Sequence, residues 1–206
     1  MTQNQQEQPT VFIVDDDPAI RFAMQALMDS VNIEHEIYSS GDEFLEKVDD
    51  HRAGCLVLDI RMPGLGGLEL QEELIKRDST LPIIFITGHG DVPMAVDAMQ
   101  KGAVDFIQKP FRDQDLLDRI REALKTDAER REEQQKHAEV AERLARLTNR
   151  EREVFDLVVT GKPNKVIAYE LGVSQRTVEI HRARVMEKMQ ARSLADLVKM
   201  HMAGDD

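Results

Sequence analysis

Five short apolar segments alternate with helical patterns between Thr10 and about Thr126, and this alternation restricts the fold more than any other feature of the sequence. A short apolar run bounded by turn residues suits a buried strand, and apolar residues spaced three or four apart suit an amphipathic helix. Five such strand–helix units in succession predict a doubly wound parallel sheet. The predicted strands lie near 10–15, 34–39, 54–59, 82–87 and 104–108, and the predicted helices near 18–31, 41–50, 66–77, 92–101 and 113–126.

Residues 127–145 have the composition of an exposed helix that continues the one begun near Asp113. The segment is rich in Glu, Arg, Gln and Ala and contains neither Gly nor Pro, which favours a helix. Arg131 interrupts a series of four apolar residues at multiples of seven, namely Leu117, Leu124, Ala138 and Ala145. Two interpretations stay open for this linker: a weak dimeric coiled coil and a rigid solvated spacer.

Residues 146–206 read as a small all-α domain of four helices. The third helix is expected from Gln175 to about Lys188 and the fourth from Ser193 to Met202. Two short helices joined by a glycine-containing turn are typical of a helix-turn-helix domain. Three of the predicted helices begin at a capping residue, and these are Thr148, Asn164 and Ser174.

Polar groups follow four of the five predicted strands. They are Asp15, Asp16 and Asp17 after the first strand, Asp59 at the end of the third, Thr87 at the end of the fourth and Lys109 after the fifth. Because the carboxyl ends of parallel strands meet at one edge of the sheet, we expect these side chains to converge there. Asp17 precedes Pro18 and is therefore predicted to cap a helix rather than to bind a ligand.

Converging carboxylates favour a hard divalent cation, and Mg²⁺ can bind one or two carboxylates and a phosphoryl oxygen while it keeps water ligands. Asp59 lies on the central strand and is the best placed acid to form an aspartyl phosphate. Lys109 would then pair with the phosphoryl oxygens, and Thr87 would donate a hydrogen bond to one of them. The strand ends therefore predict a phosphoryl-accepting site.

The net charge of −12 is spread unevenly along the chain. Residues 1–125 hold 12 Lys and Arg against 24 Asp and Glu, whereas residues 146–206 hold 11 against 9. The acidity belongs to the N-terminal part, so charge does not exclude DNA binding by the C-terminal part.

Nothing in the sequence indicates a membrane or secreted protein. No apolar stretch approaches the length of a transmembrane helix, and Met1 to Gln8 is polar, unlike a secretory signal. The one cysteine, Cys55, lies within a predicted strand and is interpreted as a core residue. We therefore expect a cytoplasmic protein without a disulfide and without a membrane partner.

The strand-end motifs resemble the receiver domain of two-component response regulators, a flavodoxin-like fold, over residues 10–126. The resemblance implies that Asp59 accepts a phosphoryl group from a sensor histidine kinase. It implies Mg²⁺ bound by Asp15, Asp16, Asp59 and the backbone carbonyl of Arg61, a switch pair of Thr87 and Phe106, and a cis bond before Pro110. The motifs are Val14-Asp15-Asp16-Asp17, Leu58-Asp59-Ile60-Arg61-Met62-Pro63-Gly64, Thr87-Gly88 and Lys109-Pro110-Phe111.

The C-terminal segment resembles the LuxR-type helix-turn-helix, and the two domains together resemble the FixJ-like group of regulators. The motifs are Leu147-Thr148-Asn149-Arg150-Glu151, Gly161-Lys162-Pro163-Asn164-Lys165 and the run Leu171 to Arg182. Glu179, Ile180 and Ala183 are candidates for contact with base edges. The candidate phosphate contacts are Lys165, Ser174, Thr177, Arg182, Arg184 and Lys188. Some relatives have Lys where this chain has Glu179, which leaves the recognised sequence open.

We therefore predict a phosphorylation-dependent transcriptional regulator rather than an enzyme. Its predicted partners are a sensor histidine kinase, double-stranded promoter DNA, a second copy of the chain after phosphorylation, and RNA polymerase. Two alternatives stay open. A Mg²⁺-dependent phosphohydrolase would need either an acid two residues after Asp59, where the chain has Arg61, or a substrate pocket built from long loops, whereas the predicted strand-end loops are short. A protein-contact module would use the helix-turn-helix only for dimerisation.

Overall fold

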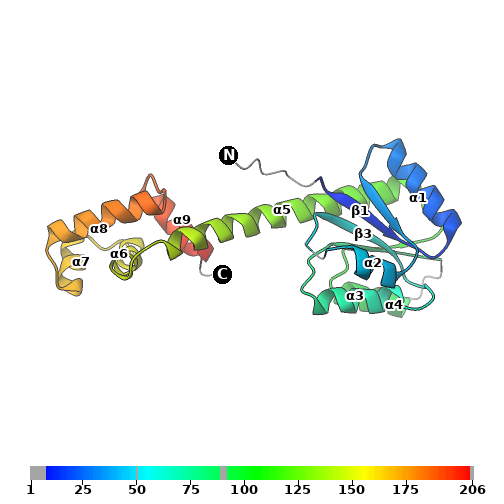
Figure 1. Ribbon diagram of the computed structural model, residues 1–206, viewed down its shortest axis with the longest axis horizontal. Helices are drawn as coiled ribbons and strands as arrows, with labels where there is room; N and C mark the ends of the chain where they lie inside the picture. The colour runs from blue at the N-terminus through cyan, green and yellow to red at the C-terminus, as the bar shows by residue number, and fades with distance from the viewer. Residues whose placement is uncertain (1–7, 50, 89–91, 205–206) are drawn as a thin grey trace. The chain divides into compact units, whose positions relative to one another are not determined.

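In the computed structural model, the five apolar runs form a five-stranded parallel sheet (Figure 1). The strand order is β2-β1-β3-β4-β5, so β2 lies on one side of β1 and the later strands β3, β4 and β5 lie on the other. This order confirms the doubly wound sheet and puts β3, which ends at Asp59, in the centre. The strands are β1 (Thr10–Val14), β2 (His35–Tyr38), β3 (Gly54–Asp59), β4 (Ile83–Thr87) and β5 (Asp105–Gln108).

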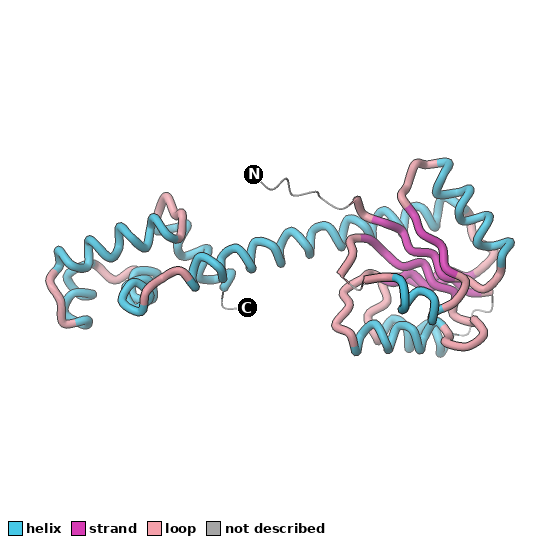
Figure 2. Tube along the Cα trace, in the orientation of Figure 1, coloured by secondary structure: helices cyan, strands magenta, loops and turns pink. Residues whose placement is uncertain are grey.

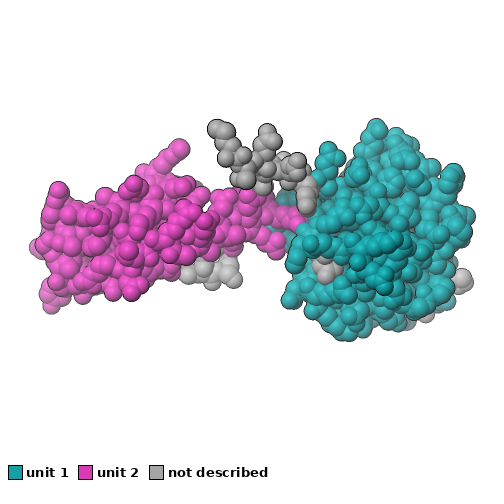
Figure 3. All heavy atoms as spheres, in the orientation of Figure 1, with its two compact units in different colours: residues 1–130 teal, residues 131–206 magenta. Residues whose placement is uncertain are grey.

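The structure describes residues 8–49, 51–88 and 92–204, so His89, expected from the sequence to be exposed or at an interface rather than a base or ligand, lies outside the described residues. The chain forms two compact units, which divide between Arg130 and Arg131 (Figure 3). Within the described ranges, no helix combines the length and the apolar character that crossing a membrane requires. The functional boundaries expected at residues 126 and 145 stay predictions.

Helices cover both faces of the sheet (Figure 2), because the strands are apolar on both faces. Along β1, Phe12 shares a core with α2, α3 and α4, whereas Val11 shares a core with α1 and α5. Cys55 is fully buried in the second core, and this burial raises the pKa of its thiol to about 12. The helices are α1 (Pro18–Ser30), α2 (Gly41–Lys47), α3 (Gly67–Lys76), α4 (Val92–Gln100) and α5 (Asp113–Ala145).

The seven-residue series of α5 does not form one apolar face for a partner helix. Leu117 is buried in the core of the N-terminal unit, and Leu124 packs against the same core. Ala138 and Ala145 are exposed. The sheet therefore makes the first two residues unavailable to a partner helix, and the choice between a coiled coil and a solvated spacer for residues 127–145 stays a prediction.

Polar contacts attach α5 to the edge of the sheet opposite Asp59. Asp127 is buried and accepts a hydrogen bond from the backbone N–H of Gly54 at 2.9 Å. Arg130 donates to the carboxylate of Asp127 and to the carbonyl of Thr80. Gly54 and Thr80 lie at the start of β3 and shortly before β4, so these contacts hold α5 to the sheet as far as Arg130.

In the described part of the C-terminal unit, four helices follow α5: α6 (Asn149–Val159), α7 (Asn164–Leu171), α8 (Gln175–Lys188) and α9 (Leu194–Gly204). Their core includes Phe155 of α6, Ile167 of α7 and Leu197 of α9. The apolar face of α8 packs on this core, since α8 buries Val178 and Val185, and Met189 directly after it is buried too.

Two of the predicted caps in this unit are confirmed and one is wrong. Thr148 and Glu151 form a reciprocal capping box at the start of α6. The Ser174 hydroxyl accepts a hydrogen bond in the first turn of α8. Asn164 is the first residue of α7 rather than its cap, and its amide oxygen accepts a hydrogen bond from Arg182 of α8 at 3.2 Å. Because the Asn164 side chain binds Arg182 of α8, it does not cap α7.

Candidate functional site

Two buried carboxylates and a lysine meet at the carboxyl edge of the sheet. Asp15 follows β1 and is 1% exposed, and Asp59 ends β3 and is 6% exposed. The Nζ of Lys109, which follows β5, lies 2.8 Å from Asp15 Oδ2 and 2.8 Å from Asp59 Oδ1. The structure thus brings together three of the residues singled out at the predicted strand ends.

The second oxygen of each carboxylate accepts a hydrogen bond from its own loop. The N–H of Asp17 donates to Asp15 Oδ1 at 2.9 Å, and the N–H of Arg61 donates to Asp59 Oδ2 at 2.8 Å. An Asp readily accepts from the backbone two residues onward where the chain turns after a strand. Each carboxylate therefore has one oxygen on Lys109 and one on the backbone, which fixes its orientation.

The cluster holds more negative than positive charge. Burial raises the pKa of Asp15, and the hydrogen bond from Lys109 opposes this shift without cancelling it. Burial also acts to lower the pKa of Lys109, but the hydrogen bonds to Asp15 and Asp59 outweigh burial, and the pKa is raised. Lys109 is therefore protonated at neutral pH, and one cation serves two carboxylates.

This donor set fits a hard divalent cation. Asp16, beside Asp15, is exposed, and Arg61 is exposed two residues after Asp59. Among the residues that the structure describes, no three His, Cys, Asp or Glu side chains form a metal site by themselves. Mg²⁺ binds in such places because it takes only one or two carboxylates and completes its shell with water and carbonyl oxygens.

Thr87 lies between the strands that carry Asp59 and Lys109. It ends β4 and is buried. The register pairs Asp59 with Ile86, and the N–H of Lys109 donates to the carbonyl of Thr87 at 2.7 Å. The predicted hydroxyl is therefore at the same edge of the sheet as the acidic cluster. The peptide bond between Lys109 and Pro110 is cis, as the resemblance implies.

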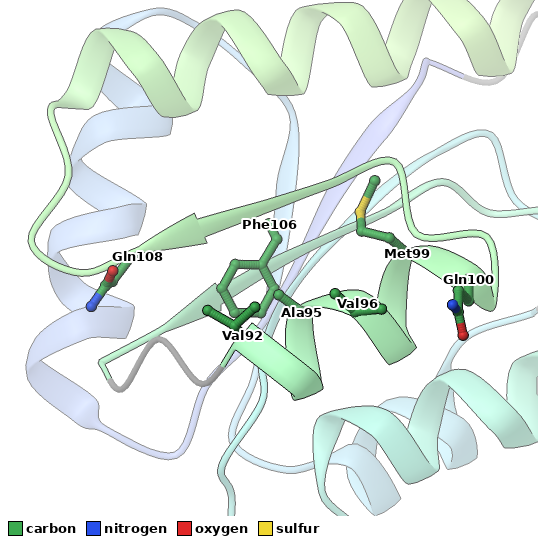
Figure 4. A pocket seen from close by; sticks show the side chains of 7 residues that line it. All are labelled: Val92, Ala95, Val96, Met99, Gln100, Phe106 and Gln108. Carbon is green, nitrogen blue, oxygen red and sulfur yellow. The ribbon is translucent and has the colours of Figure 1, made fainter.

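Phe106 of β5 lies in an apolar groove beside α4. It pairs with Phe85 in the sheet register, so its side chain lies on the same face of the sheet as Phe85 and Thr87;. Its ring projects toward Val92 and Ala95 of α4 (Figure 4). The groove has a volume of about 650 Å³. Its lining residues are Val92, Ala95, Val96, Met99, Gln100, Phe106 and Gln108.

The helix-turn-helix presents a mixed polar and apolar surface on α8. Four of the predicted DNA-facing residues of α8 are exposed, namely Glu179, Ile180, Ala183 and Arg184. Thr177 and Arg182 are half-buried, while Lys165 of α7 and Ser174 of the turn are exposed. An exposed isoleucine among charged residues suits contact with the edges of bases, where thymine offers a methyl group.

Lys188 differs from the other predicted DNA contacts. Its Nζ lies 2.6 Å from Oε2 of Glu151, and it also donates to the carbonyl of Arg146 at 3.1 Å. The side chain of Glu151 is 3% exposed. Lys188 is therefore the partner of a buried carboxylate within its own unit.

Both parts of the chain match known families. Residues 11–121 match the response regulator receiver domain, and residues 145–201 match the luxR family of bacterial regulatory proteins. Nodulation protein W of Bradyrhizobium diazoefficiens is 49% identical over 92% of this chain and 84% of that protein. The transcriptional regulatory protein FixJ of Azorhizobium caulinodans is 45% identical over 92% of this chain and 90% of that protein. The chain belongs to the FixJ-like response regulators.

Solved structures agree with this assignment. The response regulator StyR superposes with a TM-score of 0.88 at 45% identity, covering 95% of this chain and 98% of that one. Full-length FixJ from B. japonicum gives a TM-score of 0.60 at 40% identity, covering 96% and 98%. A receiver followed by a luxR-type domain makes this chain a two-component transcriptional regulator, with a histidine kinase and DNA as its partners.

Two arginines of this FixJ-like regulator were missed by the sequence reasoning. Arg21 of α1 donates to the carbonyl of Asp15 at 2.8 Å and so fixes the acidic loop. Arg176 is exposed in the first turn of α8 and pairs with Glu179 at 3.3 Å. Its position was a usable signal, because recognition helices contact bases through their N-terminal residues. The contact of Arg21 depends on the position of α1 relative to the acidic loop, which the spacing of residues in the sequence does not predict.

Proposed function

We propose that phosphorylation of Asp59 by a partner histidine kinase switches this regulator on. A carboxylate oxygen of Asp59 attacks the phosphorus of a phosphohistidine, the P–N bond breaks, and its electron pair returns to the imidazole nitrogen. The products are an aspartyl phosphate and a free histidine. The observation that carries the proposal is Lys109, 2.8 Å from both Asp15 and Asp59, since phosphoryl transfer depends on positioning and charge neutralisation.

The surplus negative charge of the site supports a requirement for Mg²⁺. The residues assigned to hold the ion are Asp15, Asp16, Asp59 and the carbonyl of Arg61. When bound, Mg²⁺ offsets the negative charge of the phosphoryl oxygens. Lys109 supplies a fixed positive charge beside Asp59, and its hydrogen bond keeps the Asp59 carboxylate oriented for attack.

Thr87 and Phe106 are proposed to carry the signal away from Asp59. The Thr87 hydroxyl donates a hydrogen bond to the phosphoryl group and moves toward it. The movement at the end of β4 then changes the packing of the Phe106 ring in the groove along α4. Phe106 has no hydroxyl, so it responds through packing. Large apolar side chains are exposed along this helix, namely Val92, Val96 and Met99. Exposed apolar patches of this kind mark protein contacts, and a second phosphorylated copy is the proposed occupant.

DNA recognition is proposed for the C-terminal unit. Glu179 accepts from cytosine N4, Ile180 contacts a thymine methyl, and Ala183 allows close approach to the bases. The proposed phosphate contacts are Lys165, Ser174, Thr177, Arg182 and Arg184. The target is double-stranded promoter DNA, where the regulator would meet RNA polymerase.

The kinase is proposed to dock on α1. This helix begins directly after the acidic loop, and its Phe22 is 75% exposed. Aromatic anchors are common at the centre of protein contacts. Phe22→Ala should slow transfer from the kinase and leave transfer from a small phosphodonor unchanged. Equal kinase rates for the variant and the wild type would remove α1 from the docking surface.

Asp59→Asn tests the central step. With Mg²⁺ and a small phosphodonor, the wild-type chain should self-associate and bind DNA more tightly, and the variant should do neither. Asp118→Asn, which changes an exposed acid of α5, is the matched control and should respond like the wild type. If Asp59→Asn responds fully to the phosphodonor, the proposed mechanism is wrong.

A further inference from the structure

Lys188 joins three segments of the C-terminal unit. It is the last residue of α8, and its ammonium lies 2.6 Å from the carboxylate of Glu151 in the first turn of α6. The same ammonium donates at 3.1 Å to the carbonyl of Arg146, which directly follows α5. One side chain therefore ties the end of the DNA-reading helix to the start of α6 and to the end of the linker helix.

The carboxylate in this contact cannot be left without a cation at low cost. Glu151 is almost fully buried, and its Oε2 also accepts from the N–H of Thr148 at 2.8 Å. The hydrogen bond from Lys188, followed by that from Thr148, lowers the pKa of Glu151 to about 2. A buried charge that loses its partner is strongly destabilising. If Lys188 moved to a DNA phosphate, the buried carboxylate of Glu151 would lose its cation.

The place of Lys188 on α8 also argues against a contact with base edges. Recognition helices reach base edges through their N-terminal residues, and Lys188 is at the opposite end of α8. The start of α8 is fixed by the Ser174 cap, and its middle by the hydrogen bond from Arg182 to Asn164 of α7. Lys188 supplies the third attachment, at the C-terminal end.

We infer that Lys188 is a positioning residue: through Glu151 it holds the recognition helix in place and does not contact DNA. The inference rests on the proposed DNA binding by the C-terminal unit, and it replaces the expected phosphate contact of Lys188. Because Lys188 also holds the carbonyl of Arg146, the orientation of α8 is linked to the end of α5 within this unit.

Glu151→Gln in the full-length chain separates the two roles of Lys188. Glutamine keeps the hydrogen bond to the N–H of Thr148, as it does in capping boxes, but removes the charge that holds Lys188. The probe is a duplex that the phosphorylated wild-type chain selects from a random pool. Positioning predicts binding weaker on the order of tenfold, within the usual coupling between residues of one network. Binding equal to or tighter than wild type would overturn the inference, because a released Lys188 would then be free for a phosphate.

The salt dependence of binding gives a second readout. Each phosphate contact contributes roughly 0.9 to the slope of log affinity against log salt concentration. Lys188→Met should weaken binding without changing this slope, whereas Lys165→Met, which removes an exposed lysine, should reduce it by about 0.9. A slope reduced equally by Lys188→Met would overturn the inference.

A double variant serves as a control for loss of folding. If Lys188→Met unfolds, the double variant Glu151→Gln with Lys188→Met removes both charges, and removing both partners of a buried pair is far milder than removing one. The double variant should show the same weak binding and the wild-type slope, and wild-type affinity would contradict positioning. A wild-type chain that selects no duplex would overturn the proposed DNA binding itself, and the inference with it.

Discussion

Two lysines of this chain form contacts of similar length with buried carboxylates, but the two sites differ in charge. Lys109 lies 2.8 Å from both Asp15 and Asp59, whereas Lys188 lies 2.6 Å from Glu151. In the receiver, one cation serves two buried acids. In the helical unit, one cation serves one acid, and the backbone N–H of Thr148 and the carbonyl of Arg146 take part in the same contact.

This difference separates a reactive site from a structural one. A balanced buried pair fixes an orientation and has no need of a ligand. An unbalanced cluster stays open to a cation and a phosphoryl group. The geometry of a single salt bridge therefore does not reveal its role, and the charge of the whole cluster does.

Removal of Lys109 should have the largest effect. Lys109→Met leaves Asp15 and Asp59 buried together without a cation, which should lower the free energy of unfolding by about 4 kcal/mol. Added Mg²⁺ should restore part of this loss, because an ion that binds only the folded state stabilises it. Urea unfolding with Mg²⁺ or with a chelator measures both effects. Equal stability of the variant in the two solutions would remove the distinction between the sites.

Removal of Lys188 should cost somewhat less and should not respond to Mg²⁺. Lys188→Met leaves the single carboxylate of Glu151 buried, with an expected loss of about 3 kcal/mol. The same urea titrations serve as the measurement. A gain in stability on adding Mg²⁺ would show that a lone buried acid also recruits the ion, contrary to the comparison.

The pH dependence of stability should report the ion pair of Glu151 with Lys188. The pKa of Glu151 falls from 4.5 to about 2 on folding. The resulting stabilisation is present above pH 4.5 and is lost as the pH falls through about 2;. The wild-type chain should therefore lose stability across this window more steeply than Glu151→Gln, and parallel curves for the two proteins would contradict the assignment.

A fourth buried carboxylate, Asp127, should contribute less to stability. Asp127→Ala removes the acceptor for the buried N–H of Gly54, and one such unsatisfied group costs about 1–3 kcal/mol. Glu129→Ala, at an exposed position of α5, should change stability by less than about 0.5 kcal/mol. Thermal unfolding of the two variants checks this, and equal melting temperatures would show that the contact contributes nothing.

The smallest effect on stability is expected for Val96→Glu in the groove beside α4. Val96 is exposed, so the folded chain should lose less than about 0.5 kcal/mol. The phosphorylated variant should nevertheless stay monomeric, because a charge would be buried against the second copy. Sedimentation of the phosphorylated variant and wild type measures this, and equal dimerisation would exclude the groove as the interface.

The sequence predicted the acidic site well because strand order and strand ends carry the information. Asp15, Asp59 and Lys109 each end or follow an apolar run, and the carboxyl ends of parallel strands meet at one edge. Convergence therefore follows from the fold without knowledge of distances. The same reasoning predicted Thr87, which the structure also brings to that edge.

What local patterns did not predict depended on contacts between elements. Leu117 and Leu124 fit a seven-residue series, but the sheet buries one and packs against the other. Asn164 is drawn to Arg182 of the neighbouring helix and does not cap its own. Glu151 and Lys188 are 37 positions apart, so their pairing is invisible to local periodicity. Local patterns identify faces and ends, whereas packing decides which partner each side chain meets.

The most direct test of the account is the site and ion dependence of phosphorylation. The full-length chain is incubated with a small phosphodonor in Mg²⁺ or in a chelator, and the modified residue is mapped by mass spectrometry of its peptides. The wild-type chain should acquire one phosphoryl group, on Asp59, and only with Mg²⁺. Modification at another residue, or equal modification of Asp59 in the chelator, would contradict the account.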